Sequence, residues 1–181
     1  MYKICITNRH LVKGDFLEQI NKVALTDVNA IILREKDLSE DEYLDLAKKV
    51  IAICKKHDKK VILHSFEGVA IKLNHPFIHM PLNKFLEMEN KSFFKEIGVS
   101  IHSVKEGMTA IKNNASYVTA SHIFKTDCKK GLEPRGLDFL RKVSGLNITV
   151  YALGGINEDN MDECIKAGAD GVCLMSGYMN I

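Results

Sequence analysis

The stretch 148–177, ITVYALGGINEDNMDECIKAGADGVCLMSG, decides the fold class because it contains a strand, a helix and a second strand in succession. Residues 148–153 and 171–175 are short runs of apolar and β-branched residues, which are typical of buried strands. Residues 158–167 between them have the pattern of an amphipathic helix. Two strands joined through a helix run parallel. The stretch therefore predicts one unit of a parallel sheet covered by helices.

The same alternation extends over the rest of the chain. Further strands are predicted at residues 3–7, 30–34, 60–64, 77–80, 98–102 and 117–121. Helices are predicted at residues 16–24, 39–56, 67–73, 83–95, 104–113 and 137–143. The clearest is 39–56, where Ser39 and Glu42 form a capping box. Eight strands with seven helices between them favour a single (β/α)8 TIM-barrel domain over residues 1–181 rather than an open doubly wound sheet.

The length of the chain is short for this fold. A barrel typically takes about 250 residues, and this chain has 181. Six residues follow the predicted eighth strand, which leaves no room for a full closing helix. We therefore expect a short barrel that lacks its last helix. The missing helix would leave the side of the barrel between the first and eighth strands exposed. A second copy of the chain could bury this surface, so a homo-oligomer is expected.

Composition excludes several classes of partner. The chain is 46% hydrophobic and 27% charged with a net charge of +2, which is typical of a globular protein without nucleic-acid or membrane partners. Its apolar runs are far shorter than the ~20 residues of a membrane helix. The first residues begin a strand rather than a signal peptide, so a cytoplasmic location is expected.

Cysteine and histidine spacings predict neither a disulfide framework nor a metal site. The five cysteines are odd in number, and no two have the spacing of a zinc or redox pair. His75 and His79 are four apart, but Pro76 favours a strand there. We expect reduced thiols and no metal site.

Glycines follow the last two predicted strands, where the chemistry of a barrel is expected. Gly154 and Gly155 follow the seventh strand, and Ser176 and Gly177 follow the eighth. Glycine lets backbone N–H groups approach an anion closely. Tight turns alone are the alternative interpretation. The presence of both motifs at neighbouring strand ends favours a phosphate site.

Two cations follow the second predicted strand. Alternation places Arg34 and Lys36 on the face of Ile32, toward the barrel mouth, and Glu35 on the other face. A solvated charge cluster is the alternative interpretation.

A polar loop at residues 121–131 follows the sixth predicted strand. Alternation from Ser116, Val118 and Ala120 predicts that His122 shares the interior face. The ordinary imidazole pKa lies near neutrality, which suits proton transfer. A structural histidine is the alternative, and Cys128 is interpreted as a loop residue without a nucleophilic role.

Four stretches resemble the thiamine phosphate synthase/TenI superfamily in the same order along the chain: 32–37 (ILREKD), 98–102 (GVSIH), 117–129 and 152–156. The resemblance covers nearly the whole chain. Residues 122–136, HIFKTDCKKGLEPRG, closely resemble the TenI-type thiazole tautomerases, whose loop carries a histidine where the synthases have proline.

Departures from the synthase pattern favour the tautomerases. In the family, the synthases hold a diphosphate through Mg²⁺ with an Asn-Asp pair after the third strand and an Asp after the fourth. This chain has His64-Ser65 and Pro81-Leu82 there. Ile32 replaces a glutamine, and Thr119 and Ser121 replace glycines, which would crowd a pyrimidine.

The resemblance implies a substrate, a reaction and a role for each candidate residue. A thiazole carboxylate bearing a phosphorylated arm would be converted to its aromatic tautomer by proton transfer, without a cofactor. His122 would move the proton, and Arg34 or Lys36 would offset the carboxylate charge. The residues that would bind phosphate are Gly154, Gly155, Ser176 and Gly177, with Ser100 and Thr126 lining the site. The alternatives are a synthase that joins a thiazole phosphate to a pyrimidine, and a non-catalytic regulator that senses a phosphate ligand.

Overall fold

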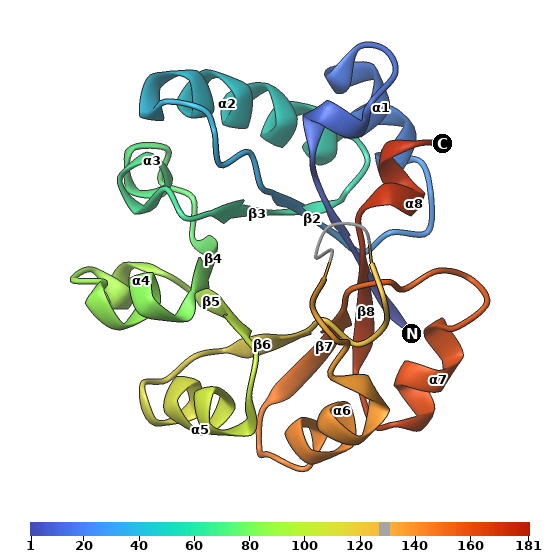
Figure 1. The fold of residues 1–181 in the computed structure, drawn as a ribbon. Coiled ribbons are helices and arrows are strands. Elements are labelled where there is room, and N and C mark those ends of the chain that lie inside the picture. Colours follow the sequence, from blue (N-terminus) through green and yellow to red (C-terminus); the bar gives the residue numbers. More distant parts are fainter. Residues whose placement is uncertain (127–130) are drawn as a thin grey trace.

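Eight parallel strands pair in chain order and close into a barrel, with helices around its outside (Figure 1). The computed structural model describes residues 1–126 and 131–181. The strands are β1 (Tyr2–Ile6), β2 (Ala30–Leu33), β3 (Lys60–His64), β4 (Phe77–Pro81), β5 (Glu96–Ile101), β6 (Tyr117–Ser121), β7 (Thr149–Leu153) and β8 (Gly171–Leu174). The predicted (β/α)8 barrel is confirmed.

The connecting helices agree with most of the predicted ranges. They are α1 (Phe16–Ala24), α2 (Glu40–Lys56), α3 (Glu67–Lys72), α4 (Leu82–Glu87), α5 (Val104–Lys112), α6 (Gly136–Ser144), α7 (Met161–Lys166) and α8 (Ser176–Met179), with 3₁₀ turns η1 (Arg9–Leu11) and η2 (Lys91–Phe93). The capping box before α2 is present, because Ser39 N–H donates to Glu42 Oε2 at 2.8 Å.

The helix predicted over residues 83–95 is wrong in extent. It divides into α4 and η2, because Met88 adopts an extended conformation that ends α4. Met88 and Phe94 are both buried in the core, so the break lets the chain fold these two side chains inward. The helix predicted over residues 158–167 starts later, at Met161.

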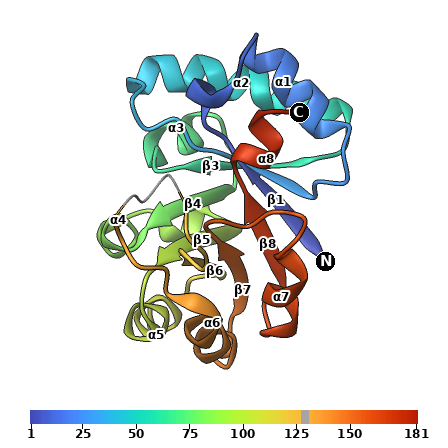
Figure 2. The same ribbon diagram turned by 45° about the vertical axis from the view of Figure 1, so that its right-hand side comes forward.

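The last helix is reduced to a single turn rather than absent, which corrects the expectation from length. Tyr178 and Met179 of α8 are buried, and the side-chain amide of Gln19 on α1 donates to the Tyr178 carbonyl at 2.7 Å. Figure 2 shows α8 next to α1. β1 pairs directly with β8, so the barrel needs no partner to close it. The expected homo-oligomer stays a prediction.

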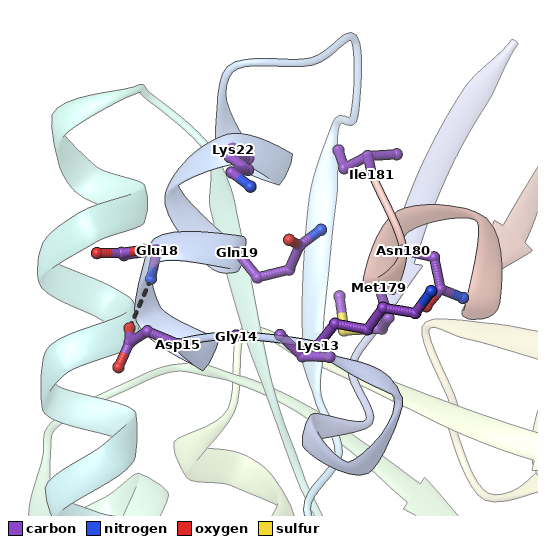
Figure 3. Close-up of a pocket in the computed structure, with 10 residues that line it drawn as sticks. Lys13, Gly14, Asp15, Glu18, Gln19, Lys22, Met179, Asn180 and Ile181 are labelled. Carbon is purple, nitrogen blue, oxygen red and sulfur yellow. Dashed lines mark hydrogen bonds between the residues drawn. The ribbon is translucent and has the colours of Figure 1, made fainter.

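A cavity of about 270 Å³ lies between α1 and the residues that follow β8 (Figure 3). Lys13, Gln19 and Lys22 line it on the α1 side, and Asn180 and Ile181 on the other. None of the predicted site residues lines this cavity.

Two apolar clusters occupy the two faces of the strands. Ile4, Ile32 and Cys173 belong to the cluster inside the barrel. Their strand neighbours belong to the larger cluster between the barrel and the helices, for example Cys5 and Ile31. Alternation along each strand therefore separates an inner from an outer core. Within the described ranges, no helix is long and apolar enough to cross a membrane.

Alternation in β6 is one residue out of phase with the prediction. Val118 and Ala120 lie in the outer cluster, whereas Tyr117 belongs to the inner one. Tyr117 fits inside because it pairs with Gly98, where a Cβ would lie 2.0 Å from the tyrosine Cζ. Alternation therefore does not place His122 on the inner face as predicted, and β6 ends before it, at Ser121.

Glu35 joins the ends of the first two strands. It is 2% exposed and accepts from the Thr7 hydroxyl at 2.6 Å and from Arg9 N–H and Nη1, both at 3.1 Å. Thr7 Oγ1 in turn accepts from the Arg34 backbone N–H at 2.9 Å. Arg9 also bonds Asp37 through both terminal nitrogens. The acidic residues of 32–37 are thus structural.

We predict that Glu35→Ala lowers the free energy of unfolding by about 3 kcal/mol, because removing one member of a buried ion pair leaves its partners unsatisfied. Urea denaturation measures this change. The control is Asp37→Ala, whose exposed carboxylate should contribute much less. Equal losses in the two variants would contradict the role given to Glu35.

Candidate active site

Arg34, His64 and His79 lie side by side at the carboxyl ends of three neighbouring strands. The pairing of Leu33 with Leu63 places Arg34 next to His64, and His64 pairs with His79. The two imidazole rings stack with centroids 5.8 Å apart. The predicted cations Arg34 and Lys36 are thus brought to the mouth, next to two buried histidines that the sequence analysis did not select.

Both histidines are held neutral. Burial lowers the pKa of His64 well below its ordinary value, and the nearby His79, Arg34, Lys36 and Lys84 lower it further. Burial lowers the pKa of His79 to about 3, with a second contribution from Arg34. Protonating either ring would add a buried positive charge beside existing cations.

His79 is the centre of a polar network inside the barrel. Its Nδ1 lies 3.1 Å from Tyr117 Oη, and its Nε2 lies 2.8 Å from Ser100 Oγ. Thr119 Oγ1 donates to Ser100 Oγ at 3.3 Å. Ser100, predicted to line the site, is therefore joined to His79 and Thr119. Had alternation been assigned so that His79 of β4 and Thr119 of β6 point inward, the sequence would have identified them as neighbours of Ser100.

A further histidine, also not selected from the sequence, connects β5 to β6. His102 Nδ1 lies 3.0 Å from the Ser121 carbonyl oxygen and 3.1 Å from its hydroxyl. This contact fixes the last residue of β6, directly before His122.

The glycine pair after β7 allows the chain that leaves β6 to pack closely. A Cβ on Gly154 would lie 2.3 Å from His122 Cβ, and one on Gly155 would lie 2.4 Å from the Lys125 carbonyl oxygen. Ile123 and Phe124 N–H groups donate to the carbonyls of Leu153 and Gly154 at 3.0 and 2.9 Å. Both glycines have positive φ, +103° and +67°. The pair thus has a packing role, and phosphate binding stays a prediction.

Ser176 and Gly177 lie at the neighbouring strand end. β7 pairs with β8 through Leu153 and Cys173, so the two polar ends follow adjacent strands of the barrel. Both Ser176 and Gly177 are exposed. Their backbone N–H groups begin α8 and have no acceptor within that helix.

His122 is buried at 4% exposure, and its Nε2 is fully enclosed without a hydrogen-bond partner in the described part of the chain. Buried polar atoms are nearly always paired, so an unpaired one calls for an explanation. The two ends of the loop between β6 and α6 are held together by a hydrogen bond, in which Arg135 N–H donates to the His122 carbonyl at 3.0 Å. Thr126 is half-buried in the same loop, and Cys128 lies outside the described residues.

The residues present do not fit a magnesium site. Mg²⁺ prefers carboxylate and other oxygen ligands. The residues after β3 and β4 are Ser65 and Leu82, and Glu35 is already committed to Thr7 and Arg9. Within 1–126 and 131–181, no group of three or more His, Cys, Asp or Glu side chains could hold a metal ion.

Comparison with known proteins identifies the family. The family model described as thiamine monophosphate synthase matches residues 3–178. The chain belongs to this family. A relative from Aquifex aeolicus, named putative thiamine-phosphate synthase 2, is 35% identical over 96% of this chain and 95% of its own length. The thiamine-phosphate synthase of Clostridium acetobutylicum is 30% identical over 99% of this chain and 88% of its own.

A solved family structure has the same architecture. The thiamine phosphate pyrophosphorylase of Pyrococcus furiosus superposes with a TM-score of 0.86 at 27% identity, over 98% of this chain and 87% of that one. The family resemblance read from the sequence is confirmed. Because the relatives carry synthase names, the finer likeness to TenI-type tautomerases stays a hypothesis.

We predict that lowering the pH from 6.5 to 5 reduces the free energy of unfolding by roughly 3 kcal/mol, because His64 and His79 stay neutral in the folded chain. Their folded pKa values lie below the ordinary 6.5, so only the unfolded chain takes up protons in this window. Stability is therefore greatest above pH 6.5 and falls as the pH drops. Urea denaturation across this range measures it.

The control for this prediction is a single substitution. His79→Gln should reduce the pH dependence, because it removes one imidazole that the fold keeps neutral. An unchanged slope in His79→Gln would show that His79 is not held neutral in the fold.

Proposed function

We propose that this family member is a metal-independent isomerase that aromatises a thiazole carboxylate phosphate by moving one proton. The observation that carries the proposal is His122, a buried imidazole that packs against the glycine pair after β7 and whose Nε2 has no hydrogen-bond partner among residues 1–126 and 131–181. An imidazole with an uncommitted nitrogen at the carboxyl end of a barrel strand has the place and the chemistry of an acid/base group.

The reaction needs a base, an anion site and little else. His122 takes the ring proton and returns it to the exocyclic carbon, so one C–H bond breaks, another forms and no group leaves. Arg34 and Lys36 offset the carboxylate charge and the negative charge that develops when the ring proton departs. Both cations lie close enough to His64 to lower the pKa of its imidazole further, after the larger effects of burial and of His79.

Phosphate binding is assigned to the ends of β7 and β8. Gly154 and Gly155 follow β7 and Ser176 and Gly177 follow the adjacent β8, next to the loop that carries His122. Their backbone N–H groups are the proposed donors to the phosphate. Ser100 and Thr126 are assigned to the lining of the site. Ser100 belongs to the polar network of His79, and Thr126 is half-buried in the loop after β6.

The second candidate is the synthase reaction, which the names of the relatives favour over the isomerase. A synthase joins a thiazole phosphate to an activated pyrimidine, and both functions share the thiazole phosphate. Against it stand His64 at the end of β3, Ser65 directly after β3 and Leu82 after β4, because none of these residues offers a carboxylate to a divalent cation.

The two functions differ in their need for a metal ion. With the non-aromatic thiazole carboxylate phosphate as substrate, we expect aromatic absorbance to appear in the presence of excess EDTA. Product that forms only with Mg²⁺ and a pyrimidine diphosphate would establish the synthase instead. Binding of the thiazole phosphate without turnover under either condition would identify a regulator.

The mechanism predicts that His122→Asn lowers kcat by about 10²- to 10⁴-fold, the range of general acid/base catalysis. The affinity for the thiazole phosphate should change little, because the phosphate is held elsewhere. Steady-state kinetics and calorimetry measure the two quantities separately, with His10→Asn as an exposed control. A variant that retains full kcat would exclude His122 as the acid/base.

A further inference from the structure

His64 is held rigidly by three neighbouring elements. Its backbone N–H donates to Tyr43 Oη at 2.9 Å, and Tyr43 donates to the Leu33 carbonyl at 2.6 Å. Its ring stacks on His79, and its Nδ1 lies 2.8 Å from Ser65 Oγ. The His64 backbone, one face of its ring and one ring nitrogen are therefore all in contact with neighbours. These contacts hold the imidazole in one orientation.

Ser65 adopts an unfavourable backbone conformation to make this contact. Its φ is +68°, in the left-handed region that non-glycine residues rarely occupy. The Ser65 N–H donates to the His79 carbonyl at 3.0 Å, which holds the residue in this conformation. Strained residues cluster at functional sites, so this outlier directs attention to the imidazole that it supports.

The other ring nitrogen of His64 remains available. Nε2 has no hydrogen-bond partner in the ranges that the structure describes, and it is not among the fully enclosed unpaired atoms there, which are His122 Nε2 and Ser144 Oγ. It therefore keeps some contact with solvent. Since His64 ends β3 on the inner face, beside Arg34, this contact is at the barrel mouth.

We infer that His64 is a ligand-contacting residue, whose Nε2–H donates a hydrogen bond to the carboxylate that Arg34 and Lys36 attract. The inference rests on the proposed function for the identity of the ligand. It requires that the Ser65 hydroxyl donates to Nδ1, which places the ring proton on Nε2. The ligand thus meets a directional donor beside the two cations that follow β2.

The charges around His64 are consistent with a neutral donor. Arg34 and Lys36 follow β2, His79 lies on β4 and Lys84 lies on α4, and all of them disfavour a charged imidazole. Specificity for a carboxylate then comes from the position of one N–H rather than from a third positive charge.

Two substitutions separate ligand contact from structural support. In His64→Gln the side-chain amide reaches the position of Nε2, whereas in His64→Asn it reaches only that of Nδ1. We expect His64→Gln to bind the aromatic thiazole carboxylate phosphate within about 3-fold of the wild type. His64→Asn should lose about 10-fold or more, the worth of a hydrogen bond to a charged group. Calorimetry measures both affinities.

Two controls accompany this comparison. The first is the thiazole phosphate that lacks the carboxylate, for which the Gln and Asn variants should bind equally well. The second is the same pair of substitutions at His75, which lies before β4 at the opposite end of the barrel and bonds the Val61 carbonyl. Urea denaturation confirms that each variant is folded.

Equal affinities of His64→Gln and His64→Asn for the carboxylate ligand would overturn the inference, as would a wild type that does not bind this ligand. A difference that persists with the ligand lacking the carboxylate would overturn it too. None of these measurements uses turnover. A wild type that binds the ligand without aromatising its precursor would contradict the isomerase proposal, while the Gln and Asn comparison would still decide the role of His64.

Discussion

Closing eight parallel strands into a barrel forces every second side chain of each strand inward, and the other features of this molecule follow from that constraint. Below the mouth the inward residues are apolar, such as Ile4 and Ile32. Toward the carboxyl ends they become polar, with His79, Ser100 and Thr119 bonded to one another. The interior therefore changes from a packed core to a site without any change of strand geometry.

The polar end of the barrel combines fixed neutral groups with cations. His79 has both ring nitrogens paired, and His64 has one nitrogen held by Ser65. Arg34 stands beside them, and the Glu35–Thr7 pair fixes its backbone. An arrangement of this kind keeps hydrogen-bond donors oriented before a ligand arrives.

Much of the fold could be predicted from the sequence because strand and helix patterns are local. The eight strands and the capping box of Ser39 and Glu42 are examples. Helix ends that depend on tertiary packing could not be predicted. Examples are the end of α4 at Met88 and the single turn of α8, which is hydrogen-bonded to Gln19. The phase of β6 depended on Gly98 making room for Tyr117, a contact across two strands.

The candidate site was predictable only in part, for the same reason. Alternation within β2 could be read locally, with Ala30 and Ile32 on the inner face and Arg34 following beside His64. The binding role of Arg34 and Lys36 stays a prediction. The neighbours His64 and His79 depend on the register between β2, β3 and β4, which no single strand encodes. The approach of His122 to Gly154 is a tertiary contact of the same kind.

The most direct test of the account is a crystal structure of the chain with the aromatic thiazole carboxylate phosphate bound. We expect the phosphate at Gly154, Gly155, Ser176 and Gly177, the carboxylate beside Arg34, and His122 Nε2 within about 3.5 Å of the exocyclic carbon. A ligand bound elsewhere, for example in the cavity between α1 and α8, or a His122 side chain that does not reach the ligand, would contradict it.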